Sequence, residues 1–295
     1  MKYSDYPTLY QASDTASLRQ QKHHIRAVIF ESSFVILAAV SSGFFLISKT
    51  ENQLCSLMTA IFLGGALVAR LLMKFKNWER DWFGTRAIAE SIKTITWRYV
   101  MGVSPYQNSL PVNALTQKLT SEIDIVFKTL PDIAAAVSPE CVGQPIHAVS
   151  ARMTEIRSLP TQERKSIYIT TRVSDQRDWY ARKTAENKGK ADFWICIILL
   201  SEFAGMGIAI YLISNQTQHF NPLGLVTTLT AALCAWAQTK RYQELAQAYG
   251  LATTELGRSE ALAHGIQTDA ELAKYVEETE DAISREHTMW TAKRK

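Results

Sequence analysis

The chain has little of what builds a disulfide scaffold, a metal centre or a catalytic site. It contains four cysteines in 295 residues, and none of them forms a CxxC pair. We therefore expect inert thiols, with neither a disulfide framework nor a zinc site. The sequence also has no P-loop, nucleophile elbow, HExxH segment or glycine-rich dinucleotide turn. These absences argue against an enzyme, and we expect that the protein binds neither a cofactor nor a metal.

A signal peptide is not evident either, because residues 1–26 are polar and the first apolar segment continues into a second one. What the chain has instead is two long apolar hairpins. Each limb has about 17–22 residues, the length that an α-helix needs to cross a hydrocarbon core. Backbone polar groups in lipid must be bonded within the segment, so the limbs should be helices. The sequence predicts an all-α membrane protein with four spans, at about 27–48, 54–73, 193–213 and 222–238.

Basic residues collect at one end of both hairpins. The net charge is only +4, but Lys and Arg precede and follow each hairpin, whereas the two outer turns hold one lysine, balanced by Glu51. Since Lys and Arg mark the cytoplasmic side, we expect a multi-pass protein of the bacterial inner membrane with both termini in the cytosol. The basic residues either contact anionic lipid head groups or only set the topology.

Polar, helix-forming sequence separates and follows the hairpins. No proline interrupts the segment after the second span, which predicts one unbroken helix to about Met101. Another helix is expected to lead into the third span, and a further one to run from Lys240 to Trp290. Both halves share this plan in parallel orientation. The predicted domains are a first unit over 1–110, a cytosolic middle segment over 111–160 and a second unit over 161–295.

Three groups of aromatic and charged residues stand in these polar segments. They are Trp78, Trp82, Glu90, Trp97 and Arg98; then Arg172, Asp175, Gln176, Trp179 and Tyr180; then Glu286, His287 and Trp290. In this spacing they resemble the cytosolic parts of SLATT membrane proteins, also called DUF4231 proteins. The resemblance covers about residues 10 to 292, as two tandem SLATT units.

The resemblance implies a pore-forming or membrane-perturbing effector of prokaryotic conflict systems, including nucleotide-signalled antiphage (antiviral) defence. The usual partners of the family are an enzyme that makes a nucleotide or a domain that senses one. Neither is recognisable in this sequence. The expected trigger is therefore a nucleotide second messenger or a signalling protein, and no nucleic-acid partner is expected.

Charged side chains inside the spans are the first candidates for function. Glu202 lies near the middle of the third span, whereas Glu31 and Arg70 lie about one turn inside the first and second spans. A carboxylate at the centre of the membrane costs several kcal/mol unless it is paired or faces water. Glu202 and Glu31 therefore either face an ion path, or Glu31 pairs with Arg70 while Glu202 bonds to neighbouring helices.

Hydroxyl side chains in the first and fourth spans have two interpretations. They either line a hydrated path or bond backbone carbonyls one turn back. The candidates are Ser41, Ser42, Thr227 and Thr230. The aromatic and charged motifs outside the spans likewise either hold a cytosolic bundle together or form a pocket or subunit interface that senses a trigger.

Three functions are compatible with this pattern: a channel, a small secondary transporter, and a membrane scaffold whose cytosolic helices dock other proteins. Transporter sites often need broken helices at corresponding places in both halves, and only Gly64-Gly65 is a candidate. Four spans leave little room for a water path within one chain. We therefore expect a channel formed by cyclic homo-oligomers in the lipid bilayer.

Overall fold

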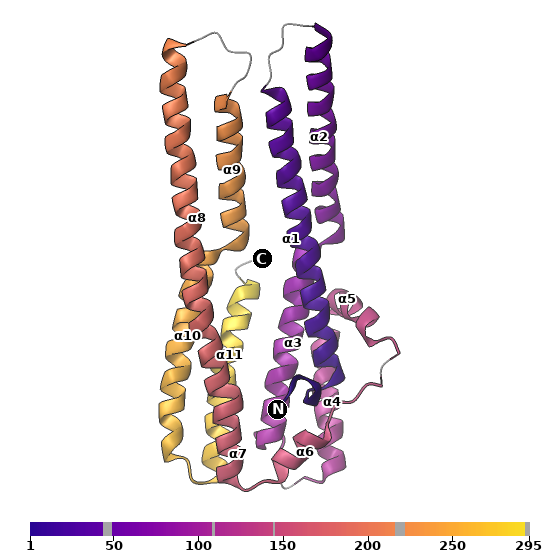
Figure 1. The fold of residues 1–295 in the computed structure, drawn as a ribbon. Helices are drawn as coiled ribbons and strands as arrows, with labels where there is room; N and C mark the ends of the chain where they lie inside the picture. The colour runs from indigo at the N-terminus through magenta and orange to yellow at the C-terminus, as the bar shows by residue number, and fades with distance from the viewer. Residues whose placement is uncertain (44–48, 108–109, 144, 216–221, 293–295) are drawn as a thin grey trace. The chain divides into compact units, whose positions relative to one another are not determined.

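The computed structural model describes residues 1–43, 49–107, 110–143, 145–215 and 222–292, and these residues contain helices and no strand (Figure 1). In chain order the helices are α1 (Thr8–Ser42), α2 (Lys49–Lys76), α3 (Trp78–Met101), α4 (Val112–Thr129), α5 (Pro131–Cys141), α6 (Ala151–Ser158), α7 (Thr161–Tyr168), α8 (Asp175–Ser214), α9 (Pro222–Lys240), α10 (Tyr242–Leu262) and α11 (Asp269–Ala292). A π-helical segment, Ile169–Ser174, joins α7 to α8, and short 3-10 turns cover Tyr3–Asp5 and Ala263–Gly265.

Three helical stretches among the described residues are long and apolar enough to cross a membrane. They are Thr8–Ser42, Glu51–Met101 and Thr161–Ile213. They contain the second and third predicted spans and residues 27–42 of the first, whose last residues, 44–48, lie outside the described residues. The fourth predicted span forms α9, which does not reach this level because polar threonines interrupt its apolar sequence. The prediction of an all-α membrane protein is confirmed, whereas the count of four spans stays a prediction.

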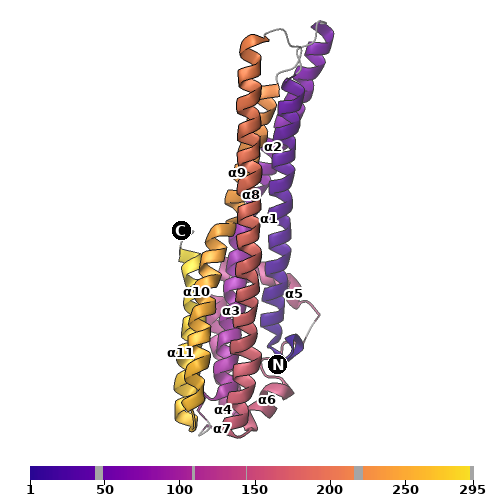
Figure 2. The ribbon, with the colours of Figure 1, turned by 60° about the vertical axis from the view of Figure 1, so that its left-hand side comes forward.

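The chain divides into two compact units, which we name the hairpin unit and the helical body. The hairpin unit comprises Lys22–Trp78 and Thr184–Gln247, and the helical body comprises Met1–Gln21, Glu79–Lys183 and Ala248–Lys295. Helices α1, α8 and α10 each contribute residues to both units, and so does α3, whose first residue belongs to the hairpin unit. Within the hairpin unit, α1 lies along α2 and α8 lies along α9 in both views (Figures 1 and 2).

Single residues in the left-handed conformation end α2 and α9. Asn77 and Arg241 both have a φ of 50°, and α3 and α10 begin at the next residue. The prediction of one unbroken helix from the second span to Met101 is therefore wrong. Asparagine tolerates the left-handed region better than most residues, so neither proline nor glycine marks this break in the sequence.

The C-terminal segment is also divided, into α10 and α11, where a single helix from Lys240 to Trp290 was expected. The division comes from a capping box. The backbone N–H groups of Gln267 and Thr268 donate to the Glu271 carboxylate at 2.8 and 2.9 Å, and the Thr268 hydroxyl accepts from the Glu271 N–H. These contacts start a new helix, and the backbone bonds hold the pKa of Glu271 below its usual value.

The core of the helical body is formed by apolar faces of α3, α4, α6 and α11. Its fully buried side chains include Ile88, Ile92, Trp97, Val100, Leu119, Ile123, Met153, Ile156, Leu272 and Val276. Tyr6 and Tyr10 from the N-terminal segment join the same cluster. Burial of this size is the main stabilising term of a helical bundle, so the body has a core of its own.

Candidate functional site

Glu31 of α1 and Arg70 of α2 form an ion pair in the first hairpin. The Arg70 Nε donates to Glu31 Oε1 at 2.6 Å, and a second guanidinium nitrogen contacts the same oxygen. The carboxylate is mostly covered, while 74% of the Arg70 side chain is exposed. Pairing lowers the cost of a charge at this depth, and it gives Glu31 a structural partner within its own hairpin.

Glu202 of α8 is different, because its side chain is exposed. Within the described part of the chain, no side chain forms a hydrogen bond or an ion pair with it. Its neighbours one turn away on α8 include the exposed apolar residues Leu199 and Met206, which are 46% and 54% exposed. A carboxylate on such a surface needs water or another polar partner.

One hydroxyl pair joins the two helices of each hairpin. In the first hairpin the Ser41 and Thr59 hydroxyls are 2.9 Å apart, and in the second the Thr230 hydroxyl donates to Ser201 at 2.9 Å. Ser41 also bonds the Leu37 carbonyl at 3.0 Å. Hydroxyl pairs of this kind hold membrane helices together.

The remaining predicted hydroxyls bond their own helices. Ser42 donates to the Ala39 carbonyl at 3.1 Å, and Thr227 donates to the Leu223 and Gly224 carbonyls at 3.0 Å. Both residues are exposed. These hydroxyl groups therefore donate to carbonyls of their own helix, a hydrogen bond that Ser and Thr often form in membrane helices.

Close packing accompanies the hydroxyl pair in the first hairpin. A Cβ atom added to Gly65 would lie 2.6 Å from the Phe34 ring, so α1 and α2 meet there with no space for a side chain. In the second hairpin, a Cβ on Gly205 would lie 3.4 Å from Val226, an ordinary contact. The first hairpin is therefore the more tightly packed at its glycine.

Aromatic residues lie at the basic ends of both hairpins. The His23 ring stacks on Trp78 with centroids 5.6 Å apart, and Lys240 lies over the Trp236 ring at 4.8 Å. Trp82 belongs to the helical body, where it stacks on Phe83 and accepts a hydrogen bond from Ser17 at its carbonyl. Trp78 and Trp82, paired in the sequence motif, thus have different surroundings.

Three residues of the first motif are tied into the helical body. Glu90 is buried and pairs with Arg86 at 2.6 Å, which also binds Asp14 at 3.0 Å. The Trp97 indole donates to the Tyr6 hydroxyl at 3.0 Å, and burial raises the pKa of Tyr6 to about 12. Arg98 forms an ion pair with Asp281 of α11.

Arg172 and Glu280 form a fully buried ion pair at the centre of the body. The carboxylate accepts from Arg172 Nε at 2.8 Å and Nη2 at 2.7 Å, from the Tyr168 hydroxyl at 3.0 Å and from the Thr94 hydroxyl at 2.9 Å. Burial opposes the charge of Arg172, but the bidentate carboxylate raises its pKa above the ordinary value. Burial and Glu280 together raise the pKa of Tyr168.

The π-helical segment places Arg172 in this pair. A π turn carries more residues per turn than an α turn and frequently marks a functional site. Here it turns Arg172 and Val173 into the core, while Thr170 and Thr171 bond carbonyls of the preceding turn. Arg172 was predicted from its motif, but the π conformation was not.

The rest of the second motif is divided between packing and solvent. Trp179 and Tyr180 contact Tyr249 of α10, with ring centroids 5.3 and 5.5 Å apart. Asp175 is exposed and Gln176 is half-buried. The third motif, Glu286, His287 and Trp290, lies on α11, and its side chains lie outside the described residues.

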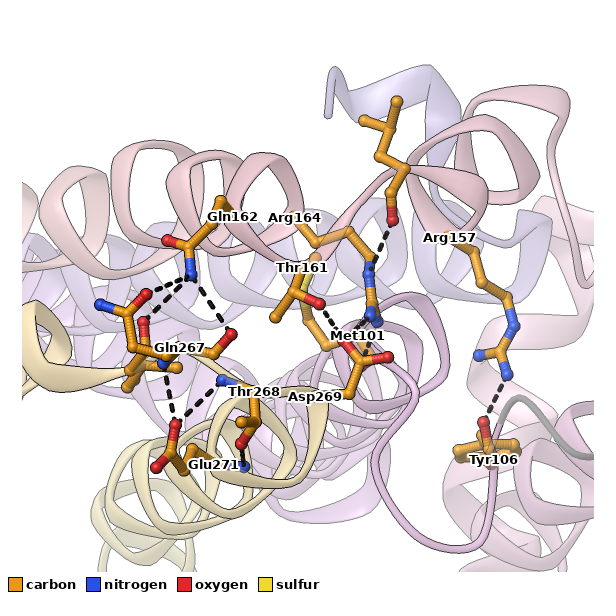
Figure 3. A network of polar contacts seen from close by, with 12 residues as sticks. Met101, Tyr106, Arg157, Thr161, Gln162, Arg164, Gln267, Thr268, Asp269 and Glu271 are labelled. Carbon is orange, nitrogen blue, oxygen red and sulfur yellow. Dashed lines mark hydrogen bonds and ion pairs between the residues drawn. The ribbon is translucent and has the colours of Figure 1, made fainter.

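A second polar network lies where α3 ends and α11 begins, and sequence reasoning missed it (Figure 3). Arg164 is 3% exposed; it donates to the Met101 carbonyl at 2.9 Å and pairs with Asp269. Arg157 donates to the carbonyls of Tyr99 and Tyr106. Both guanidinium groups therefore bind carbonyls at the C-terminal end of α3, which have no partner inside the helix, and Arg157 also binds the loop that follows.

Glu280 was missed because it stands in a Glu-rich stretch that resembles a solvated surface. The available signal was its register: Leu272, Val276 and Ile283 are buried on one face of α11, and Glu280 is one turn after Val276. A carboxylate on an apolar face requires a buried partner. Among the described residues, no group of His, Cys, Asp and Glu is arranged to hold a metal ion.

Two family models match the chain in tandem. Residues 7–165 match the SMODS and SLOG-associating 2TM effector domain 3, and residues 168–290 match the SMODS and SLOG-associating 2TM effector domain 1. The first match includes the middle segment, 111–160, as well as the first hairpin. No curated protein and no solved structure matches the chain.

Proposed function

The chain belongs to the SLATT family of two-transmembrane effector domains, as its motifs predicted, and from this premise we propose that it is an oligomeric, pore-forming membrane effector. The two matched domains each supply one hairpin, and a membrane effector of conflict systems is what the family description supports. The proposal adds that copies assemble in a ring, that an ion path lies between them, and that a cytosolic nucleotide or signalling protein opens it.

The exposed carboxylate of Glu202, unbonded among the described residues, is the observation that supports this proposal. Glu31 is paired within its hairpin, whereas Glu202 is exposed and forms no hydrogen bond or ion pair with a side chain among the described residues. A lipid-facing carboxylate is costly, so its partner in the proposed assembly is water or a second copy. Rings of acidic side chains are also the usual lining of cation-selective pores.

The hydroxyl residues support a path between copies over a path inside a hairpin. Ser41 and Thr230 bond the facing helix of their own hairpin, and Ser42 and Thr227 bond their own backbone. Their hydrogen-bonding groups are thus used in packing. The proposed effector is not an enzyme and needs no cofactor; it acts at the inner membrane, with both termini on the cytosolic side.

Disulfide cross-linking tests the assembly without knowledge of the trigger. In a variant whose four native cysteines are replaced, Glu202→Cys should form disulfide-linked dimers on oxidation in membranes, because the residue faces a path shared by several copies. Leu200→Cys and Phe203→Cys are matched controls, since both are exposed at the same depth. Equal cross-linking at all three positions, or a monomer in both detergent and nanodiscs, would contradict the proposal.

Ion flux tests the role of the carboxylate. In planar bilayers, Glu202→Gln should lower the preference for cations over anions by on the order of tenfold, because an acidic ring selects cations. Glu31→Gln is the control, and it should leave this preference unchanged. A slow, saturable flux would favour a transporter, and cross-linked oligomers that pass no ions under any condition would favour a scaffold.

A further inference from the structure

The first hairpin ends in a cluster of basic side chains that no acidic residue neutralises. We name this cluster the basic end of the first hairpin. Its members, all exposed, are Lys22, Arg26, Lys74 and Lys76. None of them forms an ion pair within the described part of the chain. The segments 22–30 and 71–78 contain no Asp or Glu at all.

Two contacts bring these four side chains to one level of the hairpin. His23 of α1 stacks on Trp78 with ring centroids 5.6 Å apart, and Glu31 pairs with Arg70 about two turns along the helix. The segment of α1 between His23 and Glu31 therefore lies along the segment between Arg70 and Trp78. Arg26, Lys74 and Lys76 lie within these segments and Lys22 precedes them by one residue, so all four cations lie at the same end of the hairpin.

Large apolar side chains lie next to the cations. Phe75 stands between two lysines in the sequence and is 74% exposed, and Phe30 of α1 is 53% exposed. Exposed leucines of α2 continue the apolar surface toward the centre of the span. A soluble anion would leave both rings in water, whereas a lipid provides a charged head group and hydrocarbon side by side.

The second hairpin lacks this arrangement. Lys188 and Lys190 each have an acidic residue two positions away in the sequence. After α9, Arg241 is paired with Glu244. Of the second hairpin's cations, Arg241 is thus held in an ion pair and Lys188 and Lys190 each have a carboxylate two positions away in the sequence, whereas no cation of the first cluster is paired among the described residues. Lys188 and Lys190 therefore serve as the comparison for Lys74 and Lys76.

From these observations we propose that the basic end of the first hairpin binds anionic phospholipid, whose head groups lie among the four cations and whose acyl chains lie against Phe30 and Phe75. Clusters of four or more Lys and Arg beside a span attract anionic lipid by about 1 kcal/mol per residue, or about fivefold in affinity each. The proposal does not depend on whether the protein conducts ions.

Lipid-dependent thermal unfolding in detergent micelles is the test. Dioleoylphosphatidylglycerol should raise the melting temperature of the full chain, because a ligand that binds only the folded state stabilises it. Dioleoylphosphatidylcholine and inorganic phosphate should not. An equal shift with phosphatidylcholine, or no shift with phosphatidylglycerol, would overturn the proposal, and an equal shift with phosphate alone would show a site for soluble anions.

Matched variants locate the site. For Lys74→Gln with Lys76→Gln, the phosphatidylglycerol concentration that gives half of the shift should rise by about 25-fold, from two charges at about fivefold each. Lys188→Gln with Lys190→Gln should leave it nearly unchanged. Removal of all four cations should abolish the shift; if that variant does not fold, the two double variants still decide. Equal effects in both hairpins would overturn the assignment.

Discussion

In the helical body, Glu280 has no exposed surface and accepts four hydrogen bonds from three side chains. In the hairpin unit, Glu202 is exposed and forms no hydrogen bond or ion pair with a side chain that the structure describes. The first arrangement fixes the folded state of one chain, because every acceptor site of the carboxylate is used. The exposed carboxylate of Glu202 needs a polar partner from outside the chain, either water or a second copy. This difference distinguishes a residue that stabilises the fold from a candidate for function.

The largest effect should come from the buried pair of the body. Glu280→Gln removes the negative charge and leaves Arg172 uncompensated in the core, so we expect a loss of about 3–5 kcal/mol in the free energy of unfolding. Unfolding in mixed detergent micelles, followed by circular dichroism, measures it. Replacing Arg172 by Met in the same variant should recover part of the loss, since the core then holds no unpaired charge.

Glu278 provides the control for this change. It lies on the same helix, its side chain is 66% exposed, and its partner Lys274 is 4.0 Å away. An exposed pair at this distance contributes at most about 0.5 kcal/mol, so Glu278→Gln should be close to neutral. If Glu280→Gln were as mild as Glu278→Gln, the carboxylate of the body would not have the structural role assigned to it.

An intermediate effect is expected where the hairpins differ in packing. Gly65→Ala would place a Cβ atom 2.6 Å from the Phe34 ring, and overpacking of this kind typically costs about 1–3 kcal/mol. The melting temperature in detergent should fall accordingly. Gly64→Ala is the matched control because nothing lies within 4 Å of its added Cβ, and Gly205→Ala should also be tolerated. A similar loss in all three variants would remove the distinction between the hairpins.

The smallest effect should come from the hydroxyl pairs, in which the two hairpins agree. Thr59→Val and Thr230→Val each remove one hydrogen bond between helices, and such bonds in membranes contribute about 0.6 kcal/mol. We expect losses of that size and of nearly equal magnitude, measured by the same unfolding assay. Thr227→Val, whose hydroxyl bonds only its own helix, should change stability less than either.

Much of the fold could be predicted because membrane helices have strong sequence signals. Length and apolarity predicted the long apolar helices, three of which could cross a membrane, and aromatic and charged spacing identified the family. The breaks at Asn77 and Arg241 could not be predicted in this way, since one residue in the left-handed region needs neither proline nor glycine. The start of α11 could have been found, because Thr268 and Glu271 have capping-box spacing.

The sequence predicted some contacts of the candidate site and missed others. The sequence placed Glu31 and Arg70 at similar depth, and the structure pairs them. Arg172 was identified by its motif, but its partner Glu280 was not, because contacts between residues 108 positions apart depend on how helices pack. The role of Glu202 stays a prediction, since the lining of a path between copies is a property of the assembly.

The π-helical segment between Tyr168 and Asp175 has a practical consequence for any residue scan of the third span. Its six residues advance around the helix axis by less than six α-helical residues would, so the phase of everything after it is offset by about 100°, the angle of one α-helical residue. A helical wheel counted from a residue before the π-helical segment, such as Arg164, would therefore assign Glu202 to the wrong face. The wheel has to be restarted at Asp175.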